Sequence, residues 1–221
     1  MVPLASHEVR WFFEGGVHQH LPLKQWFETV TPLPRPDGLP GPEWTGRQGD
    51  QPDIYLLIPG STDLGIKWRE GELQIKGRVA ALGAQLFAGR HQGVVERWIK
   101  WSYRDLPEPW RRLFVTPAGN GLIAVPVRKI RALRKLRLDW FTGTAHEVAA
   151  DTPVDRGLAI ELTDLECNGK AYCSLAFEAF PDDSGIHLAF TRAVGQFLDG
   201  LETELPLAGS LSYPAWLLQK V

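Results

Sequence analysis

The sequence is poor in cysteine, in long apolar runs and in net charge. Two cysteines among 221 residues are too few for a disulfide framework. No apolar run approaches the roughly 18 to 20 residues that cross a bilayer, and the first segment, Met1–Arg10, lacks the basic start and apolar stretch of a secretory signal. A formal net charge of −2 gives no overall attraction to nucleic acids or membranes. We therefore expect a cytoplasmic protein without membrane contact, whose electrostatic recognition is confined to local sites.

Signature motifs of hydrolases and nucleotide-binding folds are also missing. The chain has no Gly-x-Ser-x-Gly elbow, no Walker-type phosphate loop and no Gly-x-Gly-x-x-Gly fingerprint. These absences argue against nucleophilic-serine chemistry and against nucleotide binding by those routes. His18 and His20 have the spacing of a metal pair on one side of a strand. They lie beside Pro22 with no cysteine or third histidine nearby, so a surface loop is the favoured interpretation.

Apolar and aromatic residues, by contrast, are plentiful. Hydrophobic residues make up 44% of the chain, with ten Phe and nine Trp, which is enough for a sizeable core. The segment Thr31–Pro52 holds six Pro and four Gly, which interrupt regular structure. Because the stretch before it is too short to fold alone, we expect a single domain over 1–221 with a Pro- and Gly-rich insertion at about 31–52. A second irregular stretch is expected over Asp105–Gly121.

Most of the remaining chain has the pattern of β-strands. Pro126 favours a strand over a basic helix for Leu122–Asp139, although apolar residues recur there at threes. Only the end is expected to be helical, since apolar residues from Ile186 to Leu201 recur at three and four. The fold class is therefore mostly β, an antiparallel barrel with a C-terminal helix. The strands or hairpins are expected at Glu8–Phe13, Asp53–Ile58, Leu64–Val79, Val94–Tyr103, Leu122–Asp139 and Gly157–Phe180.

The dipeptide Asn168-Gly169 predicts a two-residue type I′ turn in the hairpin Gly157–Phe180. Counting outward from that turn pairs Cys167 with Lys170, Glu161 with Ala176 and Ala159 with Glu178. Side chains alternate faces along each strand, so one face is polar and carries both glutamates while the other is apolar. Cys173 falls on the apolar face and Cys167 does not, so the two cysteines should not form a disulfide.

Cations gather on one side of other strands. The stretch Arg128–Arg137 contains six basic residues in ten. Antiparallel sheets commonly have one face in contact with water, and such a face would explain the cations of any one strand taken alone. Because the charges share one sign and recur on several strands, we favour a closed barrel whose cationic interior suits phosphate-like ligands. In the hairpin at 64–79, the cations on one face are Lys67, Arg69, Lys76 and Arg78.

The order of these segments resembles the CYTH family of triphosphate tunnel metalloenzymes, which includes thiamine triphosphatases, inorganic triphosphatases and class IV adenylate cyclases. The resemblance is loose but spans most of the chain. The family's opening Glu-x-Glu-x-Lys strand keeps only its first residue, and its Arg-x-Glu-x-Glu strand is poorly kept in Val94–Lys100. The cationic half therefore survives better than the acidic half. The matching segments are Leu64–Lys67, Leu73–Gly77, Lys129 with Arg131, the acidic hairpin Ala159–Phe180, and Ser212-Tyr213, while Glu8, Arg10 and Phe12 fall on the opening strand.

The resemblance implies a β tunnel in which basic residues grip a triphosphate and acidic residues hold Mg²⁺ or Mn²⁺. Such a metal neutralises phosphate charge and positions the attacking water. Arg10 and Phe12 replace an acid and a base of the family, so binding of a polyanion is favoured over full catalysis, and no catalytic residue is assigned. The expected ligand-binding residues are Lys67, Arg69, Lys76, Arg78, Lys129 and Arg131, and the expected metal ligands are Glu8, Glu161 and Glu178, with Glu96 as a further candidate.

Three other interpretations stay open. The first is a metal-dependent triphosphate hydrolase that uses the carboxylates just named. The second is a non-catalytic protein-interaction module that presents the Pro-rich Thr31–Pro52 segment to a partner. The third is a nucleic-acid patch along Arg128–Arg137, with Trp140 and Phe141 stacking on bases, although the acidic overall charge argues against it.

Overall fold

In the computed structural model, the chain is described over residues 3–29, 38–39, 41–46, 51–115, 121–139 and 144–221. Within these residues one antiparallel sheet contains all the strands. The helices are α1 (Leu21–Thr29), α2 (Glu108–Val115), α3 (Ile186–Leu198) and α4 (Tyr213–Leu218), with short 3₁₀ turns η1 (Val17–Gln19) and η2 (Leu207–Gly209). The strands are β1 (Leu4–Glu14), β2 (Trp44–Thr45), β3 (Asp53–Leu57), β4 (Leu64–Arg69), β5 (Glu72–Phe87), β6 (His91–Tyr103), β7 (Ile123–Leu138), β8 (Ala145–Val148), β9 (Gly157–Cys167) and β10 (Lys170–Phe180).

The sheet closes on itself because β7 pairs on both sides. Its first half pairs with β3 and its second half with β9, which completes an eight-stranded ring in the order β7, β3, β4, β5, β6, β1, β10, β9. Pro126 lies where β7 has only β3 as a partner, since pairing with β9 begins at Val127. A proline is tolerated there because that edge needs no ladder donor. The short strands β2 and β8 add to the free side of β7.

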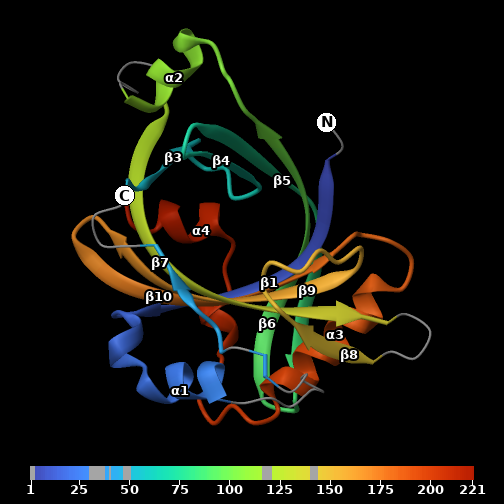
Figure 1. The fold of residues 1–221 in the computed structure, drawn as a ribbon. Helices are drawn as coiled ribbons and strands as arrows, with labels where there is room; N and C mark the ends of the chain where they lie inside the picture. The colour runs from blue at the N-terminus through green and yellow to red at the C-terminus, as the bar shows by residue number, and fades with distance from the viewer. Residues whose placement is uncertain (1–2, 30–37, 40, 47–50, 116–120, 140–143) are drawn as a thin grey trace.

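The largest hydrophobic core lies outside the ring. Outward-facing side chains of β1, β9 and β10 pack against α1 and α3, with Trp11, Phe177 and Phe197 completely buried. Figure 1 shows α1 and α3 below this part of the wall. A smaller cluster joins Phe114 of α2 to the outer faces of β3, β4 and β5. The apolar face of these alternating strands is thus buried under the helices outside the ring, and their other face points into the lumen.

One end of the lumen is filled by α4. The ring of Trp216 stacks on Phe12 with their centroids 4.4 Å apart, and Tyr55, Val125 and Val127 belong to the same buried cluster. In Figure 1 α4 lies within the ring of strands. Ser212 caps this helix by accepting a hydrogen bond from the backbone N–H of Ala215. The helix therefore sets the depth of the lumen.

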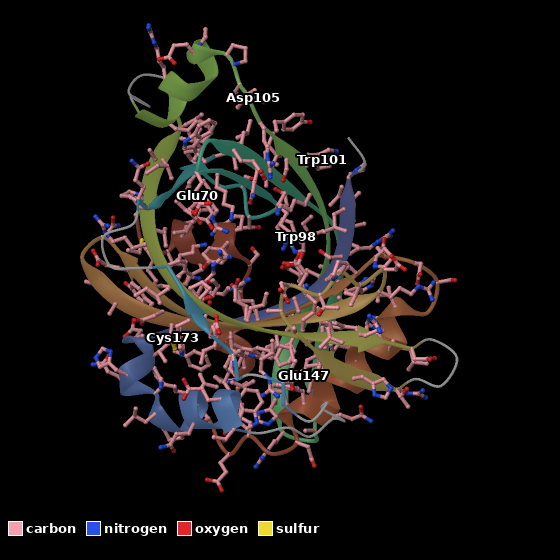
Figure 2. All side chains as sticks on the ribbon, viewed as in Figure 1. Glu70, Trp98, Trp101, Asp105, Glu147 and Cys173 are labelled. Atoms are coloured by element: carbon pink, nitrogen blue, oxygen red, sulfur yellow. The ribbon has the colours of Figure 1, made fainter. Side chains whose placement is uncertain are left out.

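Several predictions from the sequence are confirmed. The fold is mostly β, a closed antiparallel barrel with helices that include one near the C-terminus. The hairpin of β9 and β10 has the predicted register, with Cys167 opposite Lys170, and Asn168 and Gly169 both have positive φ. The cysteines are free and lie in different clusters, Cys173 against the helices and Cys167 near α4. Figure 2 places Cys173 on the side of the sheet that faces α1.

The expectation of a single helical region was wrong, since α1, α2 and α4 are also present. The segment from 105 to 121 was expected to be irregular, yet α2 lies inside it. Pro22, Pro109 and Pro214 each lie in the first turn of a short helix, where the missing N–H has no intrahelical partner. His18 lies in η1 and His20 follows it, so they do not share a strand. Of the 31–52 insertion, residues 31–37, 40 and 47–50 lie outside the described residues.

No helix in the described part of the chain is both long enough and apolar enough to cross a membrane.

Candidate functional site

The barrel encloses a cavity of about 280 Å³, which we call the lumen cavity. All eight barrel strands and the start of α4 contribute to its lining. Figure 2 shows side chains reaching into the ring and Trp98 on its inner side. The charged residues of the lining are Glu8, Arg10, Lys67, Arg69, Lys76, Glu96, Lys100, Lys129, Arg131, Glu161 and Glu178.

Three cations surround Asp53 at the start of β3. Arg69 donates to its two carboxylate oxygens at 2.6 and 2.5 Å, while the ammonium groups of Lys129 and Lys67 lie 3.3 and 3.7 Å from Oδ2. The register explains this convergence: Asp53 lies across from Val127 on β7 and next to the β4 strand that carries Lys67. One carboxylate therefore pairs with three cations, two from β4 and one from β7, the strands on either side of β3.

This crowding perturbs the protonation of the cluster. Burial alone would raise the pKa of Asp53, but the hydrogen bonds from Arg69 and the charges of Lys129 and Lys67 hold it well below its usual range. Burial, followed by repulsion from Arg69, lowers the pKa of Lys67 to about 7. Burial and the nearby Lys67 lower the pKa of Lys129 well below its ordinary value. The cluster thus lacks negative charge, and a bound anion would supply it.

Glu161 on β9 forms the second charged cluster. Its oxygens lie 3.3 Å from Arg10 and 3.5 Å from Arg131, and Thr163 donates a hydrogen bond to it at 3.0 Å. Burial works against ionisation, but Arg10, Arg131 and Lys129 hold the pKa of Glu161 well below its usual range. Glu161 therefore stays ionised at any ordinary pH and fixes both guanidinium groups toward the lumen.

The third cluster is a row of carboxylates on adjacent strands. Glu8 on β1 lies directly across from Glu96 on β6 and from Glu178 on β10. Lys76 forms ion pairs with Glu8 and, at 3.3 Å, with Glu178, while Arg78 forms one with Glu96 at 2.5 Å. Burial and the charge of Glu178 raise the pKa of Glu8. This side of the cavity is therefore acidic, with three carboxylates paired to two built-in cations.

An aromatic pair, made of Tyr55 on β3 and Tyr213 at the start of α4, lies beside the cationic side of the cavity. Tyr55 and Tyr213 stack with their centroids 5.4 Å apart, and Lys129 lies 4.0 Å above the Tyr213 ring. Lys129 also donates to the Tyr55 hydroxyl at 2.6 Å. The hydroxyl of Tyr213 is buried and has no hydrogen-bond partner among the described residues. It is a donor that a ligand oxygen in the cavity could use.

The structure brings together most of the residues that the sequence singled out. Five of the six expected ligand-binding cations line the cavity. Arg78 does not line the cavity; it forms an ion pair with Glu96, and the register of β5 shifts just after it. The predicted acidic residues Glu8, Glu161, Glu178 and Glu96 all line the cavity.

Sequence reasoning missed Tyr55, Lys100 and Tyr213 in the cavity lining, and it missed Asp53 as the carboxylate that pairs with three of the cations. Lys100 shares the parity of Glu96 and Trp98, so alternation along β6 was a usable signal. Asp53 gave no such signal, because its partners become neighbours only when the ring closes.

The carboxylates were also tested as a metal site. No group of three or more His, Cys, Asp or Glu side chains is arranged to hold a metal ion within the described residues. Lys76 engages Glu8 and Glu178, and two arginines engage Glu161, so cations occupy the oxygens that Mg²⁺ or Mn²⁺ would need. As the side chains lie, the residues do not fit such an ion, and the metal site remains a prediction.

The sequence matches no protein-family model, and no curated protein is detectably similar to it.

Proposed function

We propose that this chain is a divergent CYTH-like tunnel protein of the cytoplasm that binds a phosphorylated or otherwise polyanionic small molecule in the lumen cavity. The observation that carries the proposal is the convergence of seven cationic side chains on one cavity, against four glutamates in the same lining. Fixed cations in a low-dielectric enclosure attract anions far more strongly than cations on an open surface.

The size and donor set of the cavity favour a small ligand. Its volume of about 280 Å³ is near the lower end of pockets that hold small molecules and is too small for a macromolecule. Arg69, Lys129 and Arg131 offer charged donors on one side, and the partnerless Tyr213 hydroxyl adds a neutral one. Phosphate oxygens are well matched to such a mixture of guanidinium, ammonium and hydroxyl donors.

Thermal denaturation with tripolyphosphate tests the proposal. A ligand that binds only the native state at roughly 100 times its Kd stabilises it by roughly 2.7 kcal/mol, and added salt should reduce the effect. Arg131→Gln should reduce the shift in melting temperature. Arg104→Gln is the matched control, because Arg104 is 81% exposed and pairs with Glu72 outside the cavity. Absence of any shift with tripolyphosphate, ATP or citrate would contradict the proposal.

Metal-dependent triphosphate hydrolysis is the alternative function. What favours it is that Glu8 and Glu178 are direct cross-strand neighbours that both line the cavity. Phosphate release from tripolyphosphate with Mg²⁺ or Mn²⁺ that is lost in Glu161→Gln and Glu178→Gln would support hydrolysis at this site. Release at wild-type rates in both variants would exclude it.

A further inference from the structure

Lys67 is a lumen lysine whose surroundings differ from those of an ordinary ion pair. Its ammonium lies 3.7 Å from Asp53, and among the described residues it has no hydrogen bond. The Asp53 carboxylate already accepts two bonds from Arg69. Lys129, by contrast, is held by the Tyr55 hydroxyl, and Lys76 lies between two glutamates. Lys67 therefore lies among charged groups, but no hydrogen bond to a described residue holds its ammonium in place.

Burial and the neighbouring charges lower the pKa of Lys67, so a smaller fraction of the molecules carries this side chain in its charged form. Burial is the largest cause, repulsion from Arg69 adds to it, and the pKa of the amine falls to about 7. Roughly half of the molecules then carry a neutral, nucleophilic amine at pH 7, compared with well under 1% for an ordinary lysine. The side chain is 18% exposed, so the cavity still reaches it. The charged and titratable groups that face it are Asp53 and Tyr55 from β3, Arg69 from β4, Lys100 from β6, Lys129 from β7 and Glu161 from β9.

We propose that Lys67 is an amine nucleophile that forms an imine with a small aldehyde or ketone bearing a phosphate or carboxylate group. A neutral amine pressed among cations is a recognised way to activate lysine toward carbonyl compounds. The inference rests on the proposed function for one step, the capture of the anionic group by Arg69, Lys129 and Arg131. The same cations favour the negative charge that develops on the carbonyl oxygen.

The reaction needs no oxidant, reductant or metal. The Nζ lone pair forms a bond to the carbonyl carbon, and the π electrons move to the oxygen. Nitrogen loses a proton and the oxygen gains one, which gives a carbinolamine. The C–O bond then breaks, the oxygen leaves as water with a second proton from nitrogen, and a C=N bond forms. The sum is amine plus carbonyl giving imine plus water.

Reductive trapping tests this inference on the full chain. The protein is incubated at pH 7 with glyceraldehyde 3-phosphate and sodium cyanoborohydride, which reduces imines, and modified lysines are located by peptide mass spectrometry. Lys67 should be modified roughly a hundredfold faster than the exposed Lys170, because far more of its amine is neutral. Uncharged glyceraldehyde should modify Lys67 more slowly than its phosphate, and tripolyphosphate should protect it.

Two variants make the result specific. Lys67→Arg keeps the positive charge but has no amine to trap, so the fast adduct should disappear while the melting temperature confirms folding. Lys170→Arg should leave the fast adduct unchanged. If tripolyphosphate stabilises the wild-type protein but Lys67 is modified no faster than Lys170, the inference is overturned and the proposed function stands. If tripolyphosphate has no effect and both aldehydes modify Lys67 equally, the anionic substrate class and the proposed function fail together.

Discussion

If the lumen cavity binds an anion as proposed, Lys67 and Lys129 should couple that binding to proton uptake. Both amines have a lowered pKa, to about 7 for Lys67, because burial and neighbouring cations disfavour their charged forms. A bound anion reverses part of that penalty and raises both pKa values. Protons are therefore taken up on binding, and affinity should fall as pH rises from 7 to 9, by at most about tenfold per pH unit for each proton taken up.

Isothermal titration calorimetry with trimetaphosphate, whose charge is constant over this range, measures the effect. The apparent enthalpy should depend on the ionisation enthalpy of the buffer with the sign of proton uptake. Lys67→Met should lose part of that dependence. Equal affinity at pH 7 and pH 9, with no buffer dependence, would show that neither amine titrates on binding.

At the scale of elements, the β4–β5 and β9–β10 hairpins use the same turn with different residues. Glu70 and Gly71 have φ of +48° and +81°, and Asn168 and Gly169 have φ of +51° and +71°. A type I′ turn needs positive φ at both central residues, which glutamate adopts less readily than asparagine. Glu70→Asn should therefore raise the free energy of unfolding by about 0.5 kcal/mol in urea titrations.

Glu202→Asn is the matched control for Glu70→Asn. Glu202 is exposed and lies outside helices, strands and positive-φ turns, so the same change of side chain should leave stability nearly unchanged. If the two variants behave alike, conformational preference at the turn is not the cause.

These turns also explain why part of the site could be predicted. Once Asn168-Gly169 fixes the register of β9 and β10, alternation alone assigns Glu161 and Glu178 to the same face. The same reasoning placed Lys67 and Lys76. Local pattern could not place Asp53 beside Lys129, because that contact depends on β3 meeting β7 and on the closure of the ring by β9. Nor could it foresee the register shift beside Arg78.

The helices were hard to predict for a related reason. Helix α1 has only nine residues and α2 only eight, so neither repeats its apolar pattern for long. Isolated helices of that length are not stable by themselves and depend on tertiary packing. Trp26 and Phe27 of α1 are buried against the outer core, a contact that exists only after the barrel forms.

One buried ion pair joins these elements. Arg134 on β7 donates two bonds to Glu147 on β8, at 2.8 and 2.6 Å, and one to the Phe27 carbonyl of α1 at 2.9 Å. It also lies over the Phe197 ring of α3. The Arg134 and Glu147 side chains are 1% and 6% exposed. The pair therefore connects β7 and β8 to the two helices that cover the outer core.

Glu147→Gln should lower the free energy of unfolding by about 3 to 5 kcal/mol, because it removes one charge of a buried ion pair. Urea unfolding measures the loss. The double variant Arg134→Met, Glu147→Leu removes both charges and should be less destabilised than the single one. A single variant within about 1 kcal/mol of wild type would mean that the pair is more solvated than its burial indicates.

At the scale of the whole molecule, the barrel reverses the usual arrangement of core and surface except at the end that α4 fills. Its apolar sides face outward under α1, α2 and α3, and its lumen holds ion pairs and unbalanced cations. Burying like charges costs free energy. Around Asp53, one carboxylate among the described residues pairs with three cations, so it does not offset that cost in full. We expect such a site to lower the stability of the empty protein and, if the proposed function holds, to favour the anion that restores the balance.

Lys67→Met tests this relation between stability and binding. The native pKa of Lys67 is about 7, below that of a lysine in the unfolded chain, so the unfolded state binds more protons between pH 7 and about 10. Wild-type stability should therefore gain from this group as pH rises. At pH 7 the variant lacks the penalty and should be more stable by roughly 4 kcal/mol. The difference should shrink as pH rises through 10, because lysine then loses its proton in the unfolded state as well.

The same variant should respond less to tripolyphosphate in thermal denaturation, because one gripping cation is gone. Methionine nearly preserves the length and volume of the side chain, so packing changes little. The matched control is Lys170→Met, at an exposed position, which should change neither stability nor the ligand response. A variant less stable than wild type at pH 7 would show that Lys67 stabilises the empty barrel through Asp53. The lumen would then be a balanced structural ion network, and anion binding would lose its main electrostatic support.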